Sequence, residues 1–116
     1  KLAEIIPTKN HWVQNTLAVN AEGETVSALS KYAVKFCLAG GIDVMAGRSK
    51  VRRDQLRDIM LNILLTKDIS GSIGEFNDVS SWSEVKSVIK AFDKEVSMQI
   101  DEGFIHFHSS AKKVSV

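Results

Sequence analysis

The sequence specifies one helix more clearly than any other element, because apolar side chains recur every three or four positions between residues 81 and 99. Ser81 and Glu84 have the spacing of a capping box at its start, and Gly103 supplies a stop signal beyond its end. An amphipathic helix of this length has to bury its apolar face against other elements. The stripe that needs cover consists of Trp82, Val85, Val88, Ile89, Phe92 and Val96.

Residues 29–46 are predicted to form a central helix. They carry apolar stripes on two opposite faces, and Ser27 or Ser30 is a candidate cap near their start. Gly40 and Gly41 lower the helix propensity, so they either end or kink the helix or let another backbone come close. We favour the close approach.

Residues 49–66 are predicted to form the third main helix. Two leucines, Leu61 and Leu65, point about 130° to 170° away from its core stripe, on the side that faces water if only one face packs. We therefore expect these two leucines either to be covered by another part of the chain or to form a partner-binding surface. The core stripe itself is Leu56, Ile59, Met60, Ile63 and Leu64.

A small antiparallel sheet is predicted beside the helices. Residues 12–26 contain β-branched side chains around a turn at Asn20–Gly23, and residues 104–108 alternate like an edge strand that could pair with them. Residues 69–74 are rich in turn formers and are expected to be a connection. Residues 1–10 are predicted to be a helical turn or an N-terminal arm that Pro7 interrupts, and residues 109–116 a frayed tail.

These elements predict one α+β domain, mainly α, over residues 1–116, with three main helices around the 29–46 helix. The 116 residues are 44% hydrophobic and 25% charged, which is ordinary for a globular domain that holds a single core. No apolar run approaches the roughly 20 residues of a membrane span, and the first ten residues are too polar for a signal peptide. The expected location is the cytoplasm, without a membrane partner.

The charge balance argues against a protein that depends on a strongly basic face. The net charge is +1, whereas nucleic-acid binding usually requires a marked positive excess. The positive charge is nevertheless concentrated in one short segment, which leaves nucleic-acid binding as an alternative function. This segment contains Arg48, Lys50, Arg52, Arg53 and Arg57.

The residues capable of nucleophilic or metal chemistry are few. Cys37 is the only cysteine and lies among apolar neighbours, so we expect a buried, unreactive thiol whose replacement by serine destabilises the fold by about 1–3 kcal/mol. His106 and His108 would share one face of a strand, but two ligands do not make a metal site. A third ligand could be His11, Asp101 or Glu102, and their distance along the chain gives no evidence for any of them. We predict no catalytic residue, no metal and no cofactor, and a thiol or metal-dependent hydrolase is the least favoured alternative.

Two further polar groups have ordinary structural interpretations. Asn77 and Asp78 precede the last helix, where a carboxylate beside an amide could serve in acid–base chemistry. Capping is the favoured interpretation, because Asp78, Ser80 and Ser81 are placed to accept free backbone N–H groups at the helix start. Lys86, Lys90 and Lys94 repeat every four residues on that helix and repel one another slightly, which a partner with phosphates or carboxylates could relieve. A solvated face with Asp93 nearby is the simpler explanation.

Several landmarks occur in a recognisable order: Trp, then Ala and a turn Gly, then Ala-x-x-aromatic-Cys-x-x-Gly, then aromatic-Asn-Asp and Glu-Val. This order resembles an uncharacterised family of small actinobacterial and phage proteins, over residues 12 to about 95. The family more often has Trp where this chain has Phe36 and Phe76. The resemblance implies a bacterial or phage origin and supplies no functional residues. Its landmarks here are Trp12, Ala18, Gly23, Ala33, Phe36, Cys37, Gly40, Phe76, Asn77, Asp78, Glu84 and Val85.

The favoured functional hypothesis is a small phage or bacterial accessory protein that acts without catalysis. It would bind another protein, or a second copy of itself, through Leu61 and Leu65 on the 49–66 helix. Nucleic-acid binding through the basic segment is the alternative, and a steep dependence on salt would distinguish it from protein binding.

Overall fold

The computed structural model describes residues 1–103, which fold into five α-helices, one short 3-10 helix and a two-stranded antiparallel sheet. The sheet pairs β1 (Ala18–Val19) with β2 (Lys35–Phe36), and the 3-10 helix η1 covers Lys9–His11. The prediction of an α+β, mainly helical fold is confirmed. The α-helices are α1 (Leu2–Ile5), α2 (Leu38–Ala46), α3 (Lys50–Thr66), α4 (Ile73–Val79) and α5 (Trp82–Asp101).

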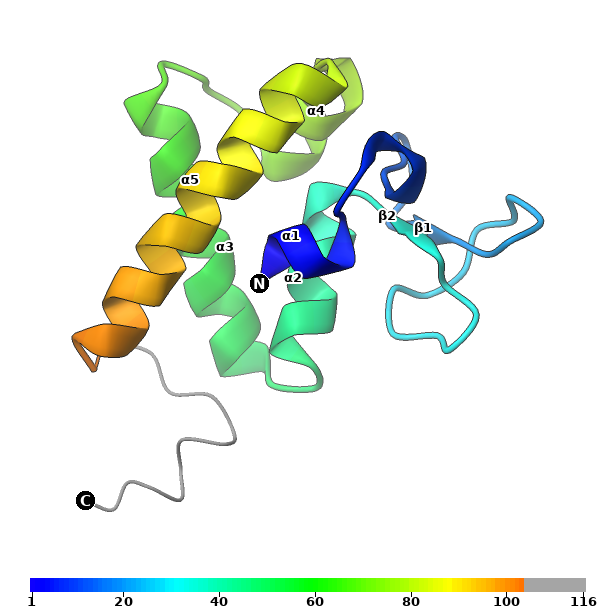
Figure 1. Cartoon of the computed structure of the whole chain (residues 1–116), viewed down its shortest axis with the longest axis horizontal. Helices are drawn as coiled ribbons and strands as arrows, with labels where there is room; N and C mark the ends of the chain where they lie inside the picture. The colour runs from blue at the N-terminus through cyan, green and yellow to red at the C-terminus, as the bar shows by residue number, and fades with distance from the viewer. Residues whose placement is uncertain (104–116) are drawn as a thin grey trace.

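Helix α5 is the long side of the core, as its sequence pattern predicts. Ser81 caps it in a capping box with Glu84, and Gly103 follows its end with a positive φ of 84°. Figure 1 shows α5, in yellow and orange, running diagonally across the molecule, with the green α3 packed beside it. The side chains that fill the space between the helices include Phe92, Val85, Leu56, Met60 and Leu64, all nearly or fully buried.

The central helix is half as long as predicted. Helix α2 does lie between α1, α3 and α4, but it begins at Leu38, and the prediction of helix over residues 29–37 is wrong. Ser27 and Ser30 act as turn formers instead of caps, because their hydroxyls accept hydrogen bonds from the N–H groups of Leu29 and Tyr32 two positions on. These local bonds compete with helix formation, and β2 then pairs with β1.

The glycine pair permits the close approach that its position in the sequence suggested. A Cβ on Gly40 would collide with the carbonyl oxygen of Leu17, and one on Gly41 would lie 2.6 Å from Leu2 Cδ1 and 2.9 Å from Ile6 Cδ1. The first glycine therefore brings the backbone before β1 against α2, and the second lets α1 sit on it. Helix α1 is consequently part of the core, with Leu2 and Ile6 at most 1% exposed.

The sheet is smaller than predicted and has a different pairing. The turn at Asn20–Gly23 is present, since Gly23 N donates to Asn20 O and the Asn20 side chain accepts from two further N–H groups. However, the segment that follows the turn contributes only an isolated bridge between Val19 and Thr25. The main partner of β1 is β2, whose residues the sequence had predicted to be helical. The predicted strand 104–108 and tail 109–116 lie outside the described residues.

Helix α4 occupies part of the region that the sequence predicted to be a connection. Ser72 Oγ accepts a hydrogen bond from the N–H of Glu75, and the Glu75 side chain accepts one from the N–H of Ser72. Together they form a complete capping box. This Ser-x-x-Glu pattern was visible in the sequence. Ile73 and Phe76 are buried by this helix against the core. None of the helices within residues 1–103 is long and apolar enough to cross a membrane.

Candidate interaction surface

Asn77 lies at the centre of a buried polar cluster and is completely inaccessible to solvent. Its side-chain oxygen accepts hydrogen bonds from Trp12 Nε1 at 2.8 Å and from the Leu38 N–H at 3.0 Å. Its amide nitrogen donates to Val13 O and to Asp78 Oδ1, each at 3.1 Å. Both protons and both acceptor positions of the amide are therefore used within the protein.

The same cluster ties the segment after η1 to the end of α4. Gln14 Nε2 donates to the carbonyl oxygens of Asn77, Asp78 and Ser80, which are among the free carbonyls of the last turn. Asp78 Oδ1 accepts from the N–H of Asn15, whose φ is +68°. Of the three capping candidates, Ser81 caps the last helix, whereas Asp78 accepts from Asn15. The Asn77 side chain instead accepts the first N–H of α2, that of Leu38. The cluster fixes three chain segments together and leaves Asn77 no hydrogen-bonding capacity for a substrate.

Cys37 is buried, as predicted, at 5% exposure. It occupies the N-cap of α2 instead of the middle of a helix, and its Sγ accepts the N–H of Gly40 at 3.3 Å. Burial raises the pKa of the thiol, so even less of it is thiolate near neutral pH than in an ordinary cysteine. These surroundings favour a structural role.

The histidines give no support to a metal site in the described residues. His11 is exposed and its Nδ1 is hydrogen-bonded to Thr8 Oγ1 at 2.9 Å. His106 and His108 lie outside the described residues. Residues 1–103 contain no group of three histidine, cysteine, aspartate or glutamate side chains positioned to hold a metal ion.

The basic segment is divided between different sides of α3. Arg48, Lys50 and Arg53 line one hollow of about 500 Å³, which Asp43 also lines. Arg57 is ion-paired with Asp43 at 2.9 Å, and Arg53 Nε lies 3.7 Å from Asp54. Arg52 lines a different hollow, together with Glu4 and Asp93. The five residues therefore do not form one continuous basic face.

The structure also separates the two leucines that the sequence grouped as a partner-binding surface. Leu61 is half-buried and packs against the core, and it lines a shallow hollow of about 520 Å³ beside the start of α4. Leu65, one turn further on, is 61% exposed. The chain covers one leucine and leaves the other in water, so the two experience different environments on the same helix.

A hollow of about 570 Å³ lies between α1 and α5. Its apolar lining comes from both elements, and Met98 remains 45% exposed there. A second hollow of about 350 Å³ adjoins it and shares Lys1, Asp93 and Ser97. We call the larger hollow the α1–α5 groove. Its lining residues are Lys1, Ala3, Ile6, Pro7, Trp82, Lys86, Ile89, Lys90, Asp93, Lys94, Ser97 and Met98.

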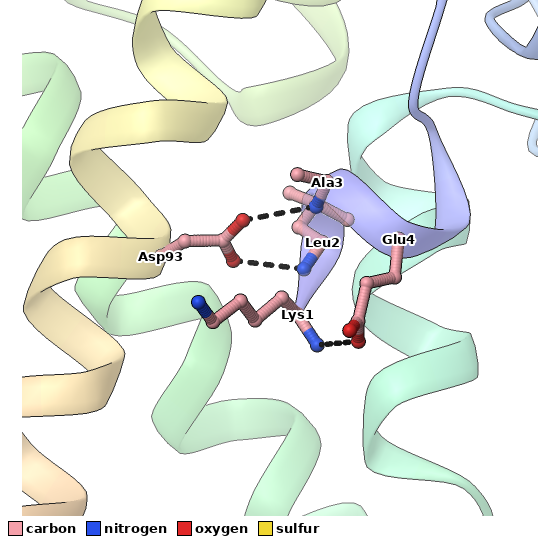
Figure 2. A network of polar contacts seen from close by, with 5 residues as sticks. All are labelled: Lys1, Leu2, Ala3, Glu4 and Asp93. Carbon is pink, nitrogen blue, oxygen red and sulfur yellow. Dashed lines mark hydrogen bonds and ion pairs between the residues drawn. The ribbon is translucent and has the colours of Figure 1, made fainter.

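Asp93 joins the two walls of the groove. Its carboxylate accepts hydrogen bonds from the N–H of Leu2 at 2.8 Å and of Ala3 at 2.9 Å, which caps the start of α1 (Figure 2). At the same place the N-terminal amino group of Lys1 contacts Glu4 Oε1 at 2.9 Å and lowers the pKa of Glu4. Both oxygens of Asp93 are thus committed to α1.

The three lysines of α5 lie exposed beside Asp93. Lys86, Lys90 and Lys94 take part in no ion pair within residues 1–103. Their exposure agrees with the solvated face that the sequence suggested, and Asp93 makes no ion pair with them because its two oxygens accept N–H groups of α1. The α1–α5 groove therefore combines an apolar floor with a row of unpaired positive charges. Sequence reasoning identified the lysine row but missed the contribution of α1, which no local pattern could assign to α5.

Comparison with protein-family models, with curated proteins and with solved structures finds no match to this chain. The resemblance to the actinobacterial and phage family stays a prediction. Five of its landmark residues nevertheless meet in one place, at the junction of α2, α4 and the segment after η1: Trp12, Cys37, Gly40, Asn77 and Asp78.

Proposed function

We propose that this chain is a non-enzymatic protein-binding module, an accessory protein of a bacterium or phage, and that it binds its partner in the α1–α5 groove. The single observation that carries the proposal is the groove itself, a hollow of about 570 Å³ with apolar side chains at its base and exposed lysines along its edge. Exposed apolar surface rimmed by polar groups is characteristic of protein interaction sites.

The state of the polar clusters supports a binding role over catalysis. The amide of Asn77 is saturated by internal hydrogen bonds, and the thiol of Cys37 is buried with a raised pKa. A catalytic group needs contact with a substrate and a proton to give or accept. Neither cluster supplies such a group at the surface, whereas the lysines of the groove are free to meet a partner.

The groove is a better partner-binding surface than the Leu61 and Leu65 pair proposed from the sequence. Leu61 already contributes to the core, so Leu65 is the one member of this pair left to serve as an apolar anchor. One exposed leucine on a surface is common and by itself indicates no interface.

Site-specific photo-crosslinking tests this function. A benzophenone amino acid placed at Ala3, on the exposed edge of the groove, is expected to capture a defined protein from a lysate of the source cells. The matched control carries the same group at Glu22, in the exposed turn after β1. Equal adducts from both positions, or none from Ala3, would contradict the proposal. An adduct of twice the chain's mass would identify a second copy as the partner.

Nucleic-acid binding is the second candidate, and it rests on the hollow that Arg48, Lys50 and Arg53 line together at the start of α3. Phosphate contacts by these residues would make the affinity fall steeply with salt. Fluorescence anisotropy with labelled duplex DNA and single-stranded RNA, at two salt concentrations, measures this directly. Salt-sensitive binding that Arg48→Glu and Arg53→Glu abolish would favour this candidate over protein binding.

A further inference from the structure

We infer that the occupant of the α1–α5 groove is an acidic amphipathic helix of a partner protein. This inference rests on the proposed function and adds the chemistry of the partner. Its basis is the combination of charge, length and apolar lining in the groove.

The charge of the groove is strongly one-sided. Four lysines line it against one carboxylate, that of Asp93, whose oxygens already accept two N–H groups of α1. Lys86, Lys90 and Lys94 project as a row without an ion pair in residues 1–103. Like charges at four-residue spacing destabilise an isolated helix slightly, so a ligand that carries carboxylates would relieve the repulsion and gain charge-assisted bonds.

The dimensions of the groove match a helix. It follows α5 from Trp82 to Met98, which corresponds to about 24 Å at 1.5 Å per residue. The three lysines are about 6 Å apart along the axis, and carboxylates at every fourth position of a partner helix have the same spacing. An extended peptide would fit less well, because the surface of α5 offers side chains and no strand edge with which peptide N–H and C=O groups could pair.

The lining of the groove distinguishes a protein helix from other acidic partners. Ala3, Pro7, Trp82 and Met98 supply apolar surface beside the lysines. A nucleic-acid backbone would engage the lysines but leave this apolar surface unused. A helix with one acidic edge and one apolar face satisfies both features at once, with apolar anchors spaced at i, i+4 and i+7.

The chain's own C-terminal residues are a poor match for the groove. Residues 104–116 contain Lys112 and Lys113 and no aspartate or glutamate, so their charge has the same sign as the lysine row. Charge complementarity therefore points to a different molecule.

Selection of peptides tests the inference with the full chain. A displayed library of random 18-residue peptides is selected on the wild-type protein, and the binding of the survivors to a variant with Lys86→Glu, Lys90→Glu and Lys94→Glu is then measured. The expected survivors are rich in Asp and Glu on one edge of a helix and apolar on the adjacent face. Basic or uncharged survivors that still depend on the groove would overturn the acidic partner while leaving the proposed function intact. Survivors indifferent to the groove variant would contradict both.

One selected peptide then measures the effect of each component. Its affinity, from fluorescence anisotropy, is expected to fall at least tenfold in the triple lysine variant and several-fold in Met98→Ser. The matched control reverses Lys9, Lys35 and Lys67, which are also exposed but lie elsewhere, and gives the same change in net charge. Equal loss in the control would show that only overall charge matters and would overturn the inference.

Two further readouts secure the interpretation. The tryptophan emission of the wild-type protein is expected to shift when the peptide binds, and a Trp82→Phe variant should lose this shift, because the Trp82 ring lines the groove. A synthetic peptide of residues 104–116 and a labelled duplex DNA are added as competitors. Displacement of the acidic peptide by the first would make the chain's own tail the occupant, and tighter binding of the second would favour nucleic acid; either result overturns the inference. Circular dichroism confirms that each variant remains folded.

Discussion

The Asn77 cluster and the lysine row of α5 are both polar, yet they differ in how their hydrogen bonds and charges are satisfied. Asn77 is fully buried and makes four hydrogen bonds inside the protein. Lys86, Lys90 and Lys94 are exposed and make no ion pair within residues 1–103. A polar group whose partners are all internal contributes to stability, whereas an exposed group without one is available to a ligand. The difference favours a role in folding for the Asn77 cluster and supports the proposed role in binding for the lysine row.

Substitution of Asn77 is expected to have the largest effect on stability. Asn77→Leu keeps the approximate size of the side chain but leaves the indole N–H of Trp12, the N–H of Leu38 and the carbonyl of Val13 without their partner. Since each buried unpaired group costs roughly 1–3 kcal/mol, the free energy of unfolding should fall by at least about 3 kcal/mol. Urea denaturation measures this fall. A loss below about 1 kcal/mol would mean that the cluster does not hold the fold together.

A pair of glycine substitutions tests whether the fold requires the close approach of the α2 backbone to Leu17. In Gly40→Ala the new Cβ meets the carbonyl of Leu17, so we expect a loss of about 1–3 kcal/mol from overpacking. Gly74→Ala is the matched control within α4, where the nearest atom is Ser72 Oγ at 3.9 Å and alanine should be neutral or slightly stabilising. Thermal unfolding of both variants gives the contrast. Equal melting temperatures would show that α2 and the Leu17 backbone can separate easily.

These examples show which parts of the fold can be predicted from the sequence. Helices α3 and α5 follow from their apolar periodicity and caps, which depend on residues close together in the chain. The early start predicted for α2 failed because Ser27 and Ser30 bond to their own neighbours, and because β2 pairs with β1, a contact that periodicity does not encode. The turn glycine and the close approach at Gly40 were predictable, whereas the partner segments were not.

The candidate site was predictable only in part for the same reason. The spacing of Lys86, Lys90 and Lys94 is visible in the sequence. That the neighbouring Asp93 makes no ion pair with them is not, because its carboxylate binds N–H groups of a segment about 90 residues away. Asn77 likewise has a local interpretation as a cap, and it does cap a helix, although one that begins 39 positions earlier. Long-range hydrogen bonds decided both outcomes.

The two leucines of α3 give an intermediate test, because one belongs to the core and the other does not. Leu61→Glu is expected to lower the free energy of unfolding by about 2 kcal/mol, since it removes packing and places a carboxylate against apolar neighbours. Leu65→Glu should change it by less than about 0.5 kcal/mol. Urea denaturation compares the variants, and light scattering records their mass. A halved mass for Leu65→Glu would make this side of α3 a homotypic interface and would move the binding surface away from α5.

Replacement of Cys37 by serine is expected to have a smaller effect than its burial alone suggests. At the N-cap of α2 the serine hydroxyl can accept the Gly40 N–H that Sγ accepts now, and serine is a preferred N-cap residue. We therefore expect a change within about 1 kcal/mol, below the 1–3 kcal/mol that the sequence indicated for a poorly satisfied hydroxyl. Denaturation of the variant decides between the two values.

The thiol itself provides a check that depends on pH. Because burial raises the pKa of Cys37 above that of an ordinary cysteine, the thiol stays protonated in the folded state at a pH where it ionises in the unfolded chain. Its contribution to stability is present below that ordinary pKa and is lost as the pH rises through the folded value. Labelling by a thiol reagent should be slow at neutral pH and become rapid in denaturant. Stoichiometric labelling of the native protein within seconds would show that the thiol is accessible.

The smallest expected effect on stability belongs to the lysine row, where substitution should stabilise the protein instead of destabilising it. Changing Lys86, Lys90 and Lys94 to glutamine removes two like-charge pairs at four-residue spacing and should raise the free energy of unfolding slightly, by about 0.5 kcal/mol in total. The gain should shrink as salt is added, because screening weakens the repulsion that the variant removes. Replacing the other exposed set, Lys9, Lys35 and Lys67, with glutamine is the control, since these residues are not four positions apart on one helix. A clear loss of stability in the first variant would mean that the lysines have internal partners and serve the fold. A gain, together with loss of peptide binding in the same variant, would mean that α5 accepts a small penalty in stability for a charge pattern that a partner uses.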